Sequence, residues 1–207
     1  MQVHRDPKTT VEELRHFPFE TFADFQAACR QGTAYPSISR QQALDWAYLG
    51  GIYASRACKT VVSLWVYLPY IAVLGFIIYA VATGRWLTLL ALPAFPVAFY
   101  MFNPTTKTLF GCVCSVLVIV CFCIIAWGFW TSSPLLIAFG IVLVTIWASE
   151  AAAYHFAQMY ARQAAVTHED CLCLLWSNWS LVVFFANGDR YSRIFETVGG
   201  ACVRHDE

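Results

Sequence analysis

The chain has 207 residues, of which 59% are hydrophobic and 13% are charged, and its formal net charge is zero. Soluble domains are about 45–50% apolar and about 25% charged, so this composition excludes an ordinary soluble protein and indicates an exterior that faces lipid. A neutral chain also lacks the basic surface that neutralises phosphates, which argues against a nucleic-acid partner. Between Val61 and Glu150 the only charged residues are Arg85 and Lys107. We therefore expect an integral membrane protein.

The N-terminal region, residues 1–59, has mixed polarity and is expected to be a cytoplasmic segment with an amphipathic helix. A short helix is predicted over 19–30, where apolar side chains recur at helical spacing. Ser39 and Gln42 have the spacing of a capping box, so a second helix should begin at about Arg40. This second helix is expected either to lie along the membrane surface or to pack on the other polar segments.

Four apolar runs follow, and each is a candidate transmembrane helix. They cover about 61–82, 86–102, 109–130 and 134–153. At about 1.5 Å of rise per residue, roughly 20 residues cross a hydrocarbon core of about 30 Å. The second run is the shortest and contains Pro93 and Pro96, so it is the weakest span and is expected to be kinked or broken. The third and fourth runs are joined by a short turn and should form an antiparallel hairpin.

The lysines and arginines near the runs predict the orientation, because cytoplasmic loops carry an excess of them. With a cytoplasmic N-terminus, the inner side holds five of them and the outer side holds Arg85; the five are Arg40, Arg56, Lys59, Lys107 and Arg162. An even number of spans returns the C-terminus to the cytoplasm. If the second run were only re-entrant, the C-terminus would lie outside.

A β-hairpin is predicted near residues 179–196 of the C-terminal tail, because apolar residues flank the pair Asn187-Gly188. Asn-Gly is the preferred pair for a two-residue turn, and that turn would place Phe184 opposite Tyr191. The first strand is apolar on both faces, so one face needs a cover. The helix expected over 19–30, or a second subunit, would provide it.

The predicted fold class is thus an all-α membrane protein, built as a four-helix transmembrane bundle. Residues 1–59 form the N-terminal segment, 60–156 the transmembrane domain and 157–207 a cytoplasmic tail with the small hairpin.

Histidines and cysteines in the tail suggest a metal site. The pattern is His-x-x-Cys-x-Cys followed by Cys-x-x-His, made by His168, Cys171, Cys173, Cys202 and His205. Imidazole and thiolate are the ligands that zinc prefers, and four of these five would complete a tetrahedral site. The spacing is not that of the usual zinc fingers or ribbons, so the alternative is a set of unrelated side chains with no cofactor.

Four more cysteines lie in the third run: Cys112, Cys114, Cys121 and Cys123. Residues two apart on a helix point about 200° apart, so these four cannot converge on one ion within the helix. We expect them to be packing residues, because free cysteine behaves as a small hydrophobe.

Glu150 is the acidic residue nearest to a span, and ionisable groups inside a bilayer are usually functional. It lies three residues from the expected end of its helix, where it can reach the headgroups. The alternatives are an interfacial carboxylate, an ion pathway and pairing with another helix.

The sequence carries no phosphate-binding glycine loop, no His-Glu-x-x-His and no Gly-x-Ser-x-Gly motif. The favoured hypothesis is a non-enzymatic membrane subunit or adaptor that docks a protein partner, or assembles with itself, through its cytoplasmic ends. The alternatives are an oligomeric transporter or pore, and an intramembrane enzyme acting on lipid or thiol.

Overall fold

The computed structural model describes residues 10–49, 54–102, 107–178, 181–193, 195–198 and 201–204. The chain forms two compact units. The helical unit comprises Thr60–Phe156, and the mixed unit combines Met1–Lys59 with Ala157–Glu207. Each unit is described separately below.

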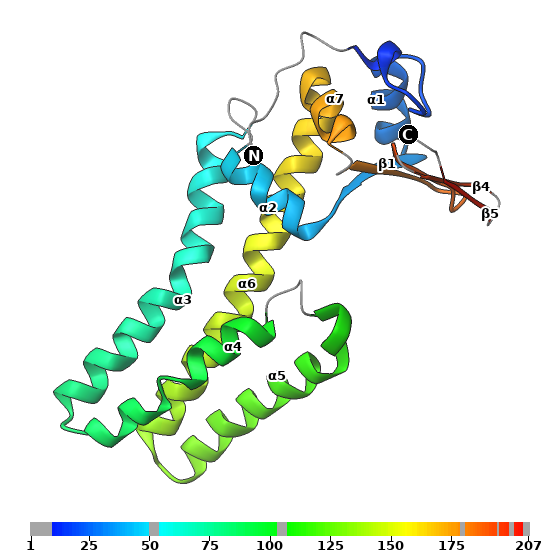
Figure 1. Ribbon diagram of the computed structural model, residues 1–207. Coiled ribbons are helices and arrows are strands. Elements are labelled where there is room, and N and C mark those ends of the chain that lie inside the picture. Colours follow the sequence, from blue (N-terminus) through cyan, green and yellow to red (C-terminus); the bar gives the residue numbers. More distant parts are fainter. Residues whose placement is uncertain are drawn as a thin grey trace. The chain divides into compact units, whose positions relative to one another are not determined.

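Helices make up the helical unit (Figure 1). In chain order they are α3 (Arg56–Ala82), the 3-10 helix η2 (Trp86–Ala91), α4 (Ala94–Phe102), α5 (Lys107–Trp130) and α6 (Pro134–Thr167), with α3 beginning and α6 ending in the mixed unit. Among the described residues, α3 and α6 are the two helices long and apolar enough to cross a membrane. Helix α6 continues fourteen residues past the expected end at 153, so the polarity of the sequence changes there but its helical character does not.

The second apolar run is broken, as its two prolines indicated. Helix η2 ends at Ala91, and α4 begins at Ala94 after Pro93. Proline lacks an N–H and disfavours a helical conformation in the residue before it, so one continuous helix over 86–102 is not formed. Pro96 lies in the first turn of α4, where its missing N–H removes no intrahelical bond.

Aromatic rings form the core of the helical unit. Phe76 of α3, Phe95 of α4 and Phe139 of α6 meet with ring centroids 5.4–6.1 Å apart. At the other end of α3, the Trp65 ring stacks on Phe156 of α6 at 6.3 Å. These contacts hold α3 and α6 side by side within this unit (Figure 1).

The mixed unit contains a five-stranded antiparallel sheet of order β1-β2-β3-β4-β5. Its strands are β1 (Ala34–Ile38), β2 (Leu181–Phe185), β3 (Arg190–Tyr191), β4 (Phe195–Val198) and β5 (Ala201–Arg204). Its helices are η1 (Val11–Glu13), α1 (Phe22–Gln31), α2 (Arg40–Leu49) and α7 (Glu169–Ser177), together with the C-terminal part of α6. The helices expected over 19–30 and from Arg40 are therefore present.

Strand β1 was not expected from the sequence, because Pro36 disfavours a strand. Proline is tolerated on an edge strand, and β1 is the edge of this sheet. Its partner is β2, with Ala34 opposite Phe185 and Ile38 opposite Leu181. The pairing joins a segment near the start of the chain to one near its end.

The cover for β2 comes from the N-terminal segment, as one of the two alternatives predicted. The Phe19 ring stacks on Phe185 of β2 with centroids 5.5 Å apart. Phe25 of α1 is fully buried, with its ring 5.5 Å from that of Phe19. Val183 is fully buried on the same side of the sheet.

The predicted hairpin register is wrong by one residue. Tyr191 pairs with Val183, and Phe184 pairs with Arg190. The turn is a three-residue loop, in which Phe185 N–H donates to Asp189 O at 2.9 Å and Gly188 has a left-handed φ of 95°. The Asn187 side chain accepts from the Asp189 N–H at 3.0 Å, which stabilises this loop over a two-residue turn.

The register shift changes which side chains lie on which face. Val183 enters the core, and Phe184 lies on the opposite face. There it stacks on Tyr35 at 5.2 Å, and the Arg190 guanidinium lies 5.1 Å from the centre of its ring.

Glycine permits a close approach of α5 to α6. A Cβ at Gly128 would lie 2.8 Å from Ile137 Cγ1 and 2.9 Å from the backbone N of Ile137. The backbone atom cannot rotate away, so a Gly128→Ala variant should lose about 1–3 kcal/mol of stability through overpacking. Thermal unfolding in detergent measures this loss. Gly75→Ala is the matched control, because no atom lies within 4 Å of its new methyl group; equal melting temperatures for the two variants would contradict the close packing.

Candidate functional site

A groove with an apolar wall lies in the N-terminal part of the mixed unit. This open groove has a volume of about 520 Å³ and is called here the Phe17 groove. Its lining residues are Val11, Glu12, Leu14, Phe17, Pro18, Phe19, Glu20 and Thr21. They come from η1 and from the loop that connects it to α1, so one continuous segment forms the whole groove.

Three contacts fix this loop on the mixed unit. The Val11 N–H donates to Glu169 Oε1 at 3.0 Å, and the Trp176 indole N–H donates to Arg15 O at 3.1 Å. The Phe17 ring packs edge-on against the fully buried Trp176 ring at 4.9 Å. A groove fixed in this way is preformed, which lowers the conformational entropy lost on binding.

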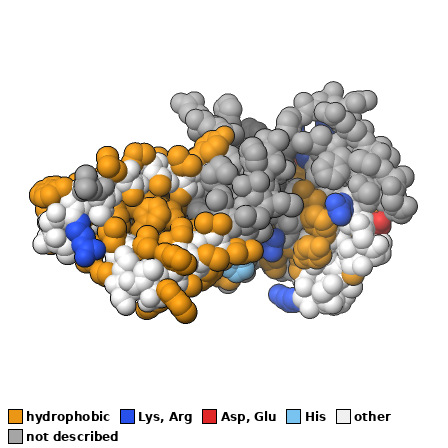
Figure 2. Space-filling view, turned by 90° about the horizontal axis from the view of Figure 1, so that it is seen from below, with side chains coloured by type: hydrophobic (Ala, Val, Ile, Leu, Met, Phe, Trp, Pro, Cys, Tyr) orange, Lys and Arg blue, Asp and Glu red, His pale blue; other side chains and the backbone are white. Residues whose placement is uncertain are grey.

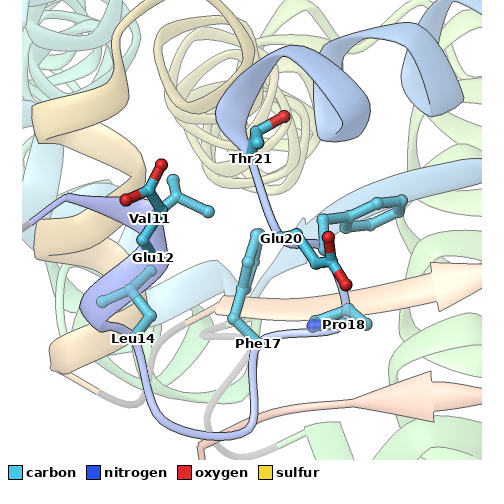
Figure 3. A pocket seen from close by; sticks show the side chains of 8 residues that line it. Val11, Glu12, Leu14, Phe17, Pro18, Glu20 and Thr21 are labelled. Atoms are coloured by element: carbon cyan, nitrogen blue, oxygen red, sulfur yellow. The ribbon is translucent and has the colours of Figure 1, made fainter.

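Two carboxylates lie at the sides of the Phe17 groove. In the view of Figure 3, those of Glu12 and Glu20 lie on opposite sides of the Phe17 ring. Both residues are exposed. Thr21 N-caps α1: its hydroxyl accepts from the Asp24 N–H at 3.2 Å and donates to the Asp24 carboxylate at 2.7 Å. No basic residue belongs to the lining.

A second, smaller cavity of about 210 Å³ lies elsewhere in the mixed unit. Its lining residues are mostly polar: Trp46, Ser55, Cys58, Tyr160, Gln163, Ala164, Thr167 and His168. The Trp46 indole N–H is buried without a hydrogen bond of ordinary geometry and approaches the Cys171 thiol, a weak acceptor. Ser55 and Thr167 bind the backbone of their own helices.

The residues of the predicted zinc site have different surroundings. His168 is exposed at the N-cap of α7, whereas Cys171 and Cys173 are buried within this helix. His205 and the side chain of Cys202 lie outside the described residues. In the part of the chain that the structure describes, no three His, Cys, Asp or Glu side chains form a metal-ligating group.

Burial keeps the thiols of α7 protonated. Desolvation raises the pKa of Cys171 to about 12, with a further rise from Asp170 and a partial offset from Trp46. Desolvation also raises the pKa of Cys173 to about 12, and neighbouring carboxylates add to this rise. Zinc binds thiolate, so binding at these two positions requires deprotonation against this shift.

The segment His168–Asp170 forms the beginning of α7, with His168 as the N-cap. Glu169 and Asp170 occupy the first turn, where negative charge favours the helix dipole. Glu169 also bonds to Val11, so this carboxylate connects α7 with η1.

The other candidate residues lie in α5 and α6. Glu150 is half-buried in α6, next to Ser149, whose buried hydroxyl has no hydrogen-bond partner among the described residues. In α5, Cys121 is buried in the core of the helical unit and Cys123 is exposed. The side chains of Cys112 and Cys114 lie outside the described set.

The Phe17 groove was not identified from the sequence. Glu12 and Glu20 are eight positions apart, and a turn between them, with His16 at a left-handed φ of 59°, gives the groove its shape. The excess of acidic residues over positions 12–24 was the one signal in the sequence that could have indicated this groove.

The raised thiol pKa values predict a pH dependence of stability. Unfolded thiols lose protons near the ordinary value of 9.0, whereas folded Cys171 and Cys173 keep theirs up to about 12. The unfolded state therefore binds fewer protons between these values, and stability should fall as the pH rises through this range. Melting temperatures from pH 7.5 to 10.5 measure the fall. The slope should be shallower in a Cys171→Ala/Cys173→Ala variant; an unchanged slope would contradict the assignment.

The zinc hypothesis has a direct test. The protein purified without chelator should carry less than one zinc per chain, and chelation should leave its melting temperature unchanged, because the thiols of α7 are buried and protonated. Elemental analysis and thermal unfolding are the measurements. One zinc per chain, lost together with stability on chelation, would show instead that Cys202 and His205 complete a site with residues of α7.

The comparisons with known proteins found no match among family models, curated proteins or solved structures.

Proposed function

We propose that the protein is a multi-pass membrane component, a non-enzymatic subunit or adaptor that docks a partner through its mixed unit. The observation that carries the membrane assignment is the uncovered apolar surface of α3 and α6. In the most apolar 18-residue stretch of each helix, 17% is buried in α3 and 28% in α6. The core helix of a soluble protein would be mostly buried, so these two helices require another apolar environment.

Lipid matches the surface of the helical unit. Large apolar side chains are exposed along α3, including Leu64, Ile71 and Ile78, each 59% exposed. Figure 2 shows hydrophobic side chains over much of the described surface in view, with few charged ones among them. Trp86 and Trp130, exposed at turns between helices, are placed like the aromatic residues that mark a membrane–water interface.

The pairing of β1 with β2 supports an even number of spans. Strand β1 precedes α3 and β2 follows α6, yet the two strands hydrogen-bond to each other. A hydrogen-bonded sheet does not cross a bilayer as an open structure, so both strands belong on one side. Helices α3 and α6 would contribute two crossings. We propose that α5 and the broken segment η2–α4 add two more, which gives a four-span bundle.

The excess of lysine and arginine on that side favours a cytoplasmic location for it. A pore is the less favoured alternative, because it requires a polar path. Within the described residues of the helical unit, Ser149 is the buried polar side chain, and the core around Phe95 is aromatic and aliphatic.

The membrane assignment predicts resistance to alkaline extraction. The protein should stay in the membrane pellet at pH 11, because its apolar helices are held by lipid rather than by surface charge. Reporter fusions after residue 207 and at Thr131, between α5 and α6, should lie on opposite sides. Release into the supernatant would contradict integration, and reporters on the same side would contradict the four-span topology.

The docking role predicts a defined complex. Purification from native membranes in mild detergent, followed by sizing and mass spectrometry, should give one partner, or further copies of this chain, in fixed ratio. Of the three alternatives for Glu150 we adopt the interfacial carboxylate, so a Glu150→Gln variant should preserve this assembly. A lone monomer would contradict the docking role, and ion flux that Glu150→Gln abolishes would favour the pore.

A further inference from the structure

We infer that the Phe17 groove binds a partner segment that presents a lysine or arginine side chain next to an apolar one. This inference rests on the proposed docking function and specifies the chemistry of the partner. The groove combines an apolar wall, made by Leu14, Phe17 and Pro18, with the carboxylates of Glu12 and Glu20.

Charge complementarity selects a cationic partner. No hydrogen bond or ion pair from the described residues engages Glu12 or Glu20, whereas the carboxylates of Glu169 and Asp24 have partners. Glu169 accepts from Val11, and Asp24 bonds to Thr21. The two unoccupied carboxylates therefore attract a cation to the groove, and they repel an acidic segment.

The apolar wall selects a neighbouring apolar side chain. The Phe17 ring is half-buried: it packs on Phe25 at 5.7 Å and on Trp176 at 4.9 Å, and its remaining surface lines the groove. An aromatic or aliphatic side chain laid against Phe17 and Leu14 would bury this remaining surface. A lysine or arginine stem can cover the same wall while its charged end reaches a carboxylate.

Three labelled heptapeptides test the inference, each with a central phenylalanine and glycines at both ends. The phenylalanine is flanked by lysines in the first, by glutamines in the second and by glutamates in the third. Binding to the full-length protein in neutral detergent is measured by fluorescence anisotropy at 50 and 500 mM salt. The lysine peptide should bind tightest, and its binding should weaken at high salt because the carboxylates are exposed.

Matched variants locate the binding site. Glu12→Gln and Glu20→Gln should each weaken the lysine peptide about 2- to 5-fold, the range for an exposed ion pair, and the double variant about 10-fold. Glu13→Gln removes the same charge from an exposed neighbour outside the groove lining and should leave binding unchanged. Melting temperatures establish that all variants are folded.

The inference would be overturned if the three peptides bound equally or if the lysine peptide did not bind. It would also be overturned if Glu13→Gln weakened binding as much as Glu12→Gln and Glu20→Gln do. Alkaline extraction separates this failure from that of the proposed function. If the protein stays in the membrane but binds no lysine peptide, only the partner chemistry proposed for the Phe17 groove is wrong. A protein released at pH 11 loses the membrane assignment, whatever the peptides do.

Discussion

The antiparallel pairing of β1 with β2 is the constraint on which the rest of the structure depends. It places Ala34 opposite Phe185, and so it joins two strands that precede and follow the whole helical unit in the sequence. The pairing creates the face that α1 and Phe19 cover, and that cover in turn positions the loop of the Phe17 groove. The same pairing is the reason for proposing an even number of membrane crossings, since a hydrogen-bonded sheet would lie on one side of a bilayer.

The two units differ in how far they bury their apolar side chains. The mixed unit buries them, with Phe25, Trp176 and Val183 almost inaccessible to solvent. The helical unit buries a small aromatic core around Phe95 and leaves much of its remaining apolar surface outward. Such a surface is stable only in contact with lipid or another apolar partner. The close contact at Gly128 shows that α5 and α6 are also held by van der Waals packing, which operates equally well in lipid.

Patterns with a strong local cause were predictable from the sequence. The helices over 19–30 and from Arg40 followed from apolar spacing and a cap, and the break at Pro93 followed from the chemistry of proline. The hairpin loop was missed although its cause is local, since the Asn187 side chain accepts from the Asp189 N–H. Features that depend on distant residues were not predictable. Strand β1 is stabilised by a partner far along the chain. The Phe17 groove escaped prediction for the same reason, since contacts from Glu169 and Trp176 hold its loop.

The pairing of β1 with β2 also imposes an order on biosynthesis. Strand β1 is synthesised before α3, whereas its partner β2 is synthesised after α6. Pairing of such distant segments is slow, because the entropy of loop closure is lost before any contact is gained. Until β2 has been made, Phe19, Phe25 and the apolar side of β1 lack the strand against which they pack. The newly made N-terminal segment is therefore prone to aggregation until β2 has been synthesised.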